Sequence, residues 1–290
     1  MPFKPLSEEQ HEAITKRLAE TIPYARQYNF DIGEDFWKKI YVDIQNWDSI
    51  CSSDKPFEDI LRPTDSFAIE VKFLGQSNIN NIANDDGLVM HPASGRFIDQ
   101  EIDANEPQKR MKDMFEAYLQ RLRNIAKKIN GGNPDLQSAD IRWGMVCYNR
   151  EKDYLPEASR FKYFESEVEI PDPDNYYPIK QEESGNLWIY KKPNGVDMSD
   201  NISPEDLGPK LYSFTTDDKL QPYIRKPADE FIYEFNTEQV HVDDRVHHRA
   251  VTVKNYDYRT FVDEIEGESN IERFNTLMAE LRKQKQIADF

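Results

Sequence analysis

Apolar residues recur at helical spacing in residues 6–27, 33–46 and 106–130, and this period predicts three helices. Ser7 followed by Gln10 is a capping-box arrangement, which places the start of the first helix at this pair. The third helix is expected to end at Gly131 and Gly132, because glycine readily takes the backbone conformation that terminates a helix.

A different pattern precedes and follows the third helix. Residues 57–61 and 66–74, joined by the turn sequence RPTD, predict a β-hairpin. The longer arm, SFAIEVKFL, is apolar at both alternating positions, which is typical of a central strand covered on both faces. Residues 139–149 read as a further buried strand. The order of helix, hairpin, helix and strand predicts an α/β (α+β) fold with a mixed central sheet flanked by helices.

The second half has another character. Strand candidates of a few residues each are separated by turns rich in Pro, Asp and Gly, and lie at residues 160–170, 186–192, 210–215, 230–235 and 249–255. Two closing helices are expected at 256–267 and 270–286. We therefore expect residues 1–160 to form the core. Residues 161–290 would form a β-rich extension with C-terminal helices, within the same compact unit.

Composition narrows the class of protein. The 290 residues are 38% hydrophobic, which is enough for one large domain or two small ones. No apolar run approaches the roughly 20 residues of a membrane span, and the N-terminus has no signal-like apolar stretch. Cys51 and Cys147 form no disulfide framework, so we expect a reduced cytoplasmic protein without a membrane partner. The net charge of −17 disfavours loose adhesion to nucleic acid but allows a local basic groove.

Charged residues interrupt the apolar arm of the hairpin. Glu70 and Lys72 project from the same face of the expected strand, about 7 Å apart. The preceding arm can bring Asp59 or Glu58 next to Glu70. Two close carboxylates repel unless a cation joins them, and hard oxygen ligands suit Mg²⁺. A magnesium ion there can polarise a phosphodiester, and Lys72 can orient or deprotonate a water or stabilise the charged phosphate.

The residues Asp59, Glu70 and Lys72, with helices before and after, resemble the PD-(D/E)xK nuclease superfamily, which includes many type II restriction endonucleases. The resemblance covers roughly residues 8–150. It implies a restriction-endonuclease-like core in which these three residues are catalytic and Asp59 and Glu70 hold Mg²⁺. In this superfamily an additional acid can come from the preceding helix, and here Glu20 and Glu34 are the candidates, with Glu58 a third possibility in the hairpin.

Contacts with DNA are expected elsewhere. The candidates are Gln108, Lys109 and Arg110 at the start of the third helix, and Arg245 and Arg249 in a later basic segment. That segment also holds His241, His247 and His248, for which a zinc site is an alternative. His91, in the polar stretch 75–106, is expected to be a surface histidine, with contact to a phosphate as the alternative.

These observations predict a Mg²⁺-dependent endodeoxyribonuclease that cuts double-stranded DNA at a specific sequence, as a type II restriction enzyme does. A palindromic target would call for a homodimer, and residues 161–290 are expected to take part in DNA recognition or dimerisation. Two alternatives are open. The first is a repair, phage or modification-dependent nuclease of the same superfamily. The second is an acidic, non-enzymatic binding protein or DNA mimic, which the charge of −17 favours.

Overall fold

The computed structural model describes residues 6–28, 32–45, 50–51, 59–76, 78–91, 106–149, 160–197, 202–217 and 219–237. This part of the chain is a mixed α and β structure with three α-helices and two sheets. The mixed sheet flanked by helices, as predicted, is therefore confirmed.

The three helices lie where the apolar period placed them. They are α1 (Glu8–Tyr28), α2 (Glu34–Gln45) and α3 (Pro107–Ile129). The capping box is present, because the Ser7 amide donates to Gln10 Oε1 at 2.8 Å and the Gln10 amide donates to Ser7 Oγ at 3.2 Å. The chain leaves α3 through two glycines with positive φ, Gly131 at 60° and Gly132 at 98°.

The first sheet has six strands in the order β1-β2-β3-β5-β6-β11. Their bounds are β1 (Ile50–Cys51), β2 (Ile60–Arg62), β3 (Phe67–Gln76), β5 (Asp140–Asn149), β6 (Arg160–Glu167) and β11 (Tyr233–Asn236). The β2–β3 pair is the predicted antiparallel hairpin, whereas β3 and β5 run parallel over their full length, with α3 in the connection between them. The prediction of a central strand is confirmed, since β3 lies between β2 and β5.

The second sheet has five strands in the order β4-β10-β9-β8-β7. They are β4 (Leu88–Met90), β10 (Leu220–Arg225), β9 (Lys210–Phe214), β8 (Leu187–Lys191) and β7 (Tyr176–Lys180). Strands β8 and β9 were predicted, whereas β4, β7 and β10 were not. The strand expected at 249–255 and the two closing helices lie outside the described residues.

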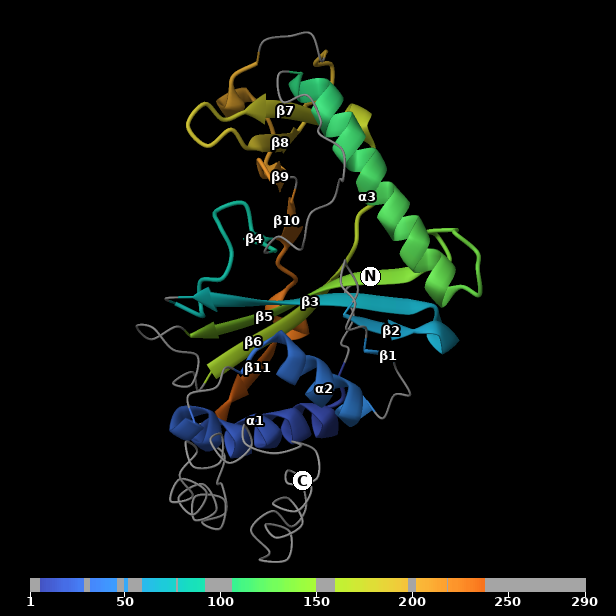
Figure 1. The fold of residues 1–290 in the computed structure, drawn as a ribbon. Helices are drawn as coiled ribbons and strands as arrows, with labels where there is room; N and C mark the ends of the chain where they lie inside the picture. Colours follow the sequence, from blue (N-terminus) through green and yellow to red (C-terminus); the bar gives the residue numbers. More distant parts are fainter. Residues whose placement is uncertain are drawn as a thin grey trace, which may run out of the picture.

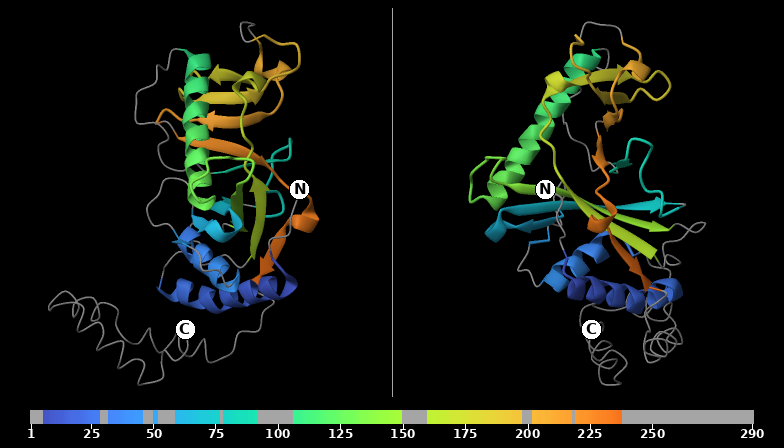
Figure 2. Two further views of the ribbon diagram at one scale, coloured as in Figure 1. Left: turned by 90° about the vertical axis from the view of Figure 1, so that its right-hand side faces the viewer. Right: turned by 180° about the vertical axis from the view of Figure 1, so that it is seen from behind.

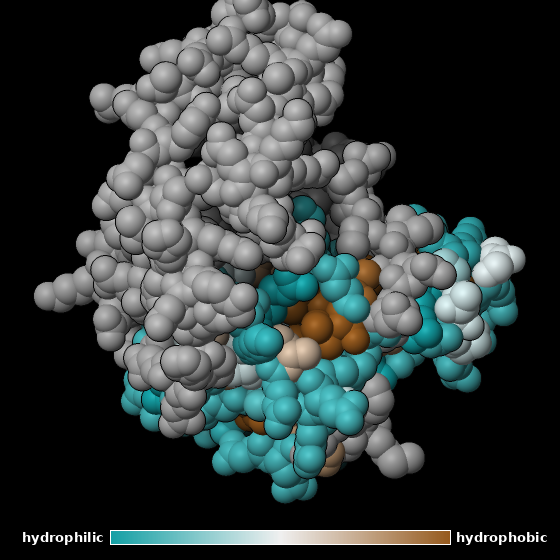
Figure 3. Space-filling model, turned by 90° about the horizontal axis from the view of Figure 1, so that it is seen from below, coloured by the Kyte–Doolittle hydropathy of each residue, from teal (hydrophilic) through white to brown (hydrophobic). Residues whose placement is uncertain are grey.

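Helices cover both faces of the first sheet. In Figure 1, α1 and α2 lie below it, and α3 rises from its upper side towards the second sheet at the top. The views in Figure 2 show the same arrangement from the side and from behind. From below, the described surface over these elements is largely hydrophilic, with a hydrophobic area in a hollow (Figure 3).

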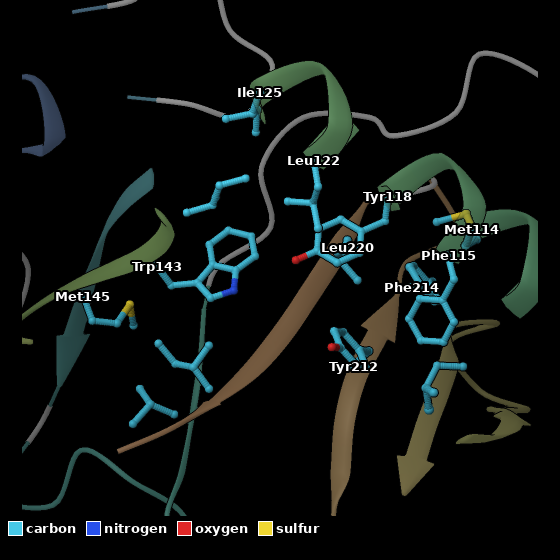
Figure 4. Packing of buried hydrophobic residues seen from close by; sticks show 14 of the residues in the cluster. Met114, Phe115, Tyr118, Leu122, Ile125, Trp143, Met145, Tyr212, Phe214 and Leu220 are labelled. Carbon is cyan, nitrogen blue, oxygen red and sulfur yellow. The ribbon is translucent and has the colours of Figure 1, made fainter. Parts of the chain in front are cut away.

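The hydrophobic core has two parts, one on each face of the first sheet. The lower part joins α1 and α2 to Ile69 and Val71 of β3. The upper part joins α3 to both sheets, and Figure 4 shows Tyr118 and Leu122 reaching from α3 towards Trp143 of the first sheet, with Tyr212 of the second sheet in the same cluster. One helix therefore fixes the position of the second sheet over the first.

The two halves of the chain share both sheets. β6 and β11 come from residues beyond 159 but complete the first sheet, whereas β4 precedes residue 100 and joins the second. Among the described residues, no helix has the length and apolarity that a membrane crossing requires.

Candidate active site in the hairpin

The candidate site lies where β2 ends beside β3. The last paired residue on this edge is Ile69, opposite Ile60. The next residue along the preceding segment, Asp59, uses its amide to donate to Ile69 O at 3.0 Å. Its side chain then takes the place of a strand partner, because Oδ2 accepts from the amide of Val71 at 2.7 Å. The sequence therefore fixes Asp59 to the edge of β3 through both its backbone and its carboxylate.

Glu70 and Lys72 lie on one face of β3, as their spacing predicts. The Lys72 Nζ is 3.2 Å from Glu70 Oε1 and 4.0 Å from Asp59 Oδ2. The Glu70 side chain is only 2% exposed. The hairpin thus brings Asp59, Glu70 and Lys72 together, and all three are buried.

Helix α2 supplies a further acid. Glu34, the first residue of α2, places Oε2 at 3.1 Å from Lys72 Nζ and is 26% exposed. Glu20, the other predicted helix acid, lies on α1 and faces Lys16 at 3.9 Å instead. Glu34 is therefore the helix acid that joins the group. Glu58 lies outside the described residues.

A second lysine reaches the site, and sequence reasoning missed it. Lys38 Nζ lies 2.7 Å from Asp59 Oδ1 and 3.1 Å from Asp35 Oδ1, and its side chain is 6% exposed. Lys38 follows Glu34 by four residues, which places both on one side of α2. That spacing was the available signal, although only the packing of α2 under β3 shows that the side faces Asp59. We call Glu34, Lys38, Asp59, Glu70 and Lys72 the Lys72 cluster.

Burial and like charges control protonation in the Lys72 cluster. Burial raises the pKa of Glu70 well above its usual value; the charges of Asp59 and Glu34 add to the rise, and Lys72 opposes it. Burial works against the charge on Lys72, but Glu70, Asp59 and Glu34 outweigh it and raise its pKa. Lys72 is thus a stable ammonium, whereas Glu70 carries its charge at a cost that a further cation would reduce.

The donor set suits a hard divalent cation. As the side chains stand, no group of three or more His, Cys, Asp or Glu residues in the described ranges is gathered to hold a metal ion. The ammonium of Lys72 instead contacts or approaches all three carboxylates, within 4.0 Å. Carboxylate oxygens are the ligands that Mg²⁺ prefers. Asp59 and Glu70 would be its protein ligands, with Glu34 beside them.

The other predicted residues lie away from this cluster. Arg110 is 3% exposed, and its guanidinium donates to Thr215 O at 2.9 Å, which ties α3 to the second sheet. Gln108 and Lys109 are on the exposed side of the first turn of α3, where contact with DNA stays a prediction. Arg245, Arg249 and the three histidines of that segment lie outside the described residues.

The expectation of a surface histidine at position 91 is wrong. His91 is fully buried, and its ring centroid is 4.4 Å from that of Trp143. Its amide donates to Pro222 O at 2.9 Å, so β4 and β10 hold the histidine between the two sheets.

A second group of buried charges lies on the opposite face of the first sheet. Glu165 Oε1 accepts from the hydroxyls of Tyr41 and Tyr163, each at 2.7 Å, and Glu165 Oε2 accepts from Arg142 Nη1 at 3.0 Å. Arg142 also donates through Nε to Asp140 at 2.7 Å. We call these five residues the Arg142 cluster. Burial raises the pKa of Glu165, while Tyr41, Arg142 and Tyr163 oppose the rise.

Comparison with known proteins gives no relative for this arrangement. No protein-family model, no curated protein and no solved structure matches the chain.

Proposed function

We propose that this chain is a Mg²⁺-dependent endodeoxyribonuclease of the PD-(D/E)xK superfamily. It would hydrolyse phosphodiester bonds of double-stranded DNA at a specific sequence, in the manner of a type II restriction enzyme. The observation that carries the proposal is the convergence of Asp59, Glu70 and Glu34 on Lys72 Nζ, at distances of 3.1–4.0 Å. Three carboxylates around one ammonium, at a strand whose other side chains form the core, add little to the stability of the core. The same arrangement is well suited to phosphoryl chemistry.

The fold around the cluster supports the same proposal. β3 carries Glu70 and Lys72 in the middle of a mixed sheet, and its edge is free of a described strand beyond Ile69. Helix α2 presents Glu34 and Lys38 to that edge. Glu34 is the most exposed member of the cluster at 26%, so a phosphate backbone that approaches this edge would meet the cluster from the Glu34 side.

Each side chain has a distinct task in this mechanism. A bound Mg²⁺ would polarise the phosphate and lower the pKa of a water. Asp59 and Glu70 would hold it, and Lys38 would orient Asp59 through Oδ1. Lys72, whose neighbours favour the ammonium, would act as a charged donor to the phosphate oxygen that gains negative charge, and not as a base.

The target would be double-stranded DNA, and a palindromic site cut on both strands would require a homodimer. The second sheet lies beside the core and has its own surface, so it is the natural place for elements that read the sequence. This assignment of roles to the two sheets belongs to the proposal.

The direct test is cleavage of plasmid DNA by the full chain, with Mg²⁺ and with EDTA. We expect discrete Mg²⁺-dependent fragments from the wild type and none from Lys72→Ala. Lys39→Ala is the matched control, because Lys39 is an exposed lysine on α2 and its loss changes the charge equally. Intact DNA with every methylated and unmethylated substrate would reject the nuclease in favour of the acidic binding protein. Fragments that persist in Lys72→Ala would reject the site.

A further inference from the structure

A cleft of about 670 Å³ lies between the two sheets, separate from the Lys72 cluster. Its walls come from β5, β6 and the segment after β6 on one side, and from β4, β7, β8, β9 and β10 on the other. This volume lies in the range of sites for small ligands, about 300–1,000 Å³. None of the residues proposed for catalysis lines it.

Aromatic side chains form the floor of the cleft. Trp143, Tyr176 and Tyr212 line it and are themselves buried, with exposed fractions of 3%, 7% and 5%. Figure 4 shows Trp143 and Tyr212 on facing elements, one on each sheet. Tyr223 of β10 adds a partly exposed ring at the side. The three floor rings are almost covered, so Tyr223 is the ring against which a planar group in the cleft can stack.

Polar and cationic groups form the rim. Lys191, Lys192 and Arg225 line the cleft, and among the described residues no carboxylate lies within 4.0 Å of their charged nitrogens. Two acids, Glu167 and Glu169, also line it, so three cations face two acids in a chain of net charge −17. The rim is therefore a locally basic place on an acidic protein, which suits a phosphate.

The cleft is connected to the candidate active site by one row of residues across the first sheet. Glu70 pairs in register with Trp143, and Trp143 pairs with Ser166, which also lines the cleft. With strands about 4.8 Å apart, Trp143 lies one strand from Glu70 and Ser166 lies two strands, or about 10 Å, from it. A nucleotide in the cleft would therefore lie within a few steps of the phosphate that is cut, since DNA rises about 3.4 Å per step.

We propose that this cleft binds a single nucleotide of the DNA, with its base turned out of the duplex. The base stacks against Tyr223 above the floor of buried rings, and its phosphate lies at Lys191, Lys192 and Arg225. The polar side chains of Ser166 and Asn175 line the same space; Asn175 Nδ2 donates to Asp172 Oδ2 at 3.2 Å, which leaves its Oδ1 for the edge of the base. The proposal rests on the proposed function and adds to it a site that senses one base near the cut.

The test uses 2′-deoxynucleoside 5′-monophosphates titrated into the full wild-type chain in EDTA, followed by calorimetry. We expect saturable binding, weakened at least about tenfold, or 1.4 kcal/mol, in the double variant Lys191→Ala/Lys192→Ala. The matched control is Lys127→Ala/Lys128→Ala at the exposed end of α3, which removes the same charge and should bind as the wild type does.

Three results would overturn the proposal. The first is the absence of saturable binding up to about 10 mM nucleotide, a concentration far above the Kd of most specific ligands. The second is an equal loss of affinity in the control variant. The third is inorganic phosphate that binds as tightly as the nucleotide, because the aromatic rings would then have no role. None of these readouts needs Mg²⁺ or Lys72, so nucleotide binding and DNA cleavage can fail independently.

Discussion

Two groups of buried charge lie on opposite faces of the same sheet, and they are built differently. In the Arg142 cluster every oxygen of Glu165 accepts from a donor: two tyrosine hydroxyls reach Oε1 and an arginine reaches Oε2. In the Lys72 cluster two ammoniums meet three carboxylates: Asp59, Glu70 and Glu34 share Lys72, and Asp59 also pairs with Lys38. Burial raises the pKa of the central acid in both, but neighbouring acids add to the rise only for Glu70.

This difference separates a structural ion pair from a candidate site. A buried acid that is fully supplied with donors holds elements together, here α2 through Tyr41 and the sheet through Arg142 and Tyr163. A buried acid beside other acids lowers the stability of the fold, and a further cation is needed to neutralise its charge. The first arrangement should break the fold when altered, and the second should break the activity.

The largest loss in the free energy of unfolding is expected from Glu165→Gln. The change leaves the largely buried Arg142 guanidinium, 12% exposed, with an amide in place of Glu165 and Asp140 as its remaining carboxylate partner; breaking a buried pair in this way costs about 3–5 kcal/mol. Denaturant unfolding of the variant would measure it. Glu116→Gln is the control, because it removes a surface pair with Arg123, which is worth about 0–1 kcal/mol. Equal losses in the two variants would contradict a structural role for the Arg142 cluster.

Glu70→Gln should show the opposite behaviour. We expect cleavage to fall by at least about 10²–10³-fold, the effect of removing a group that stabilises the transition state. Stability should stay within about 1 kcal/mol of the wild type, because the change also removes a buried charge beside two others.

A thermal-shift experiment sharpens the Glu70 comparison. Mg²⁺ should stabilise the wild type by about 2.7 kcal/mol at one hundred times its Kd and should leave Glu70→Gln unchanged. An unfolded variant, or a variant that still responds to Mg²⁺, would contradict the proposed role of Glu70 in holding Mg²⁺.

Lys38→Ala should lower the rate of cleavage by an intermediate amount. Lys38 touches Asp59 rather than the substrate, and losing such a supporting contact typically lowers activity by about 10–100-fold. Lys38→Arg should restore part of the rate, because arginine keeps the charge that holds Asp59 Oδ1. The exposed neighbour Lys39→Ala should retain full cleavage. A rate for Lys38→Ala equal to that of the Lys39 control would assign Lys38 to packing alone.

The smallest effect is expected at an exposed pair. Hydrogen bonds from Lys219 and Thr215 lower the pKa of Asp217 from 3.8 to about 2. Because its pKa falls on folding, this acid stabilises the protein above pH 3.8 and loses that contribution as the pH falls towards about 2. Solvent limits the gain to below about 1 kcal/mol. The free energy of unfolding should be measured for Asp217→Asn and for the wild type from pH 6 to pH 2. We expect a small difference between the two proteins that disappears towards pH 2.

Much of the fold could be predicted from the spacing of apolar residues and from the residues that end helices and strands. The helices, the hairpin and the buried strand β5 were predictable because each has a strong apolar pattern and clear ends. β7 and β10 were missed because each contains a proline, which usually argues against a strand. β7 lies at the edge of its sheet, and Pro222 lies where β10 changes partners from β9 to β4, so neither proline breaks a run of paired amides.

The sequence by itself determined that Glu70 and Lys72 share a face of β3 and that a short hairpin brings Asp59 to them. Alternation along a strand and the reach of a turn are local properties, and local properties can be predicted from a sequence. Only the tertiary structure decided between Glu20 and Glu34, brought Lys38 to Asp59 and buried His91 against Trp143. Those contacts depend on how a helix or a second sheet packs against β3 and β5, and packing is settled by the whole core rather than by any one segment.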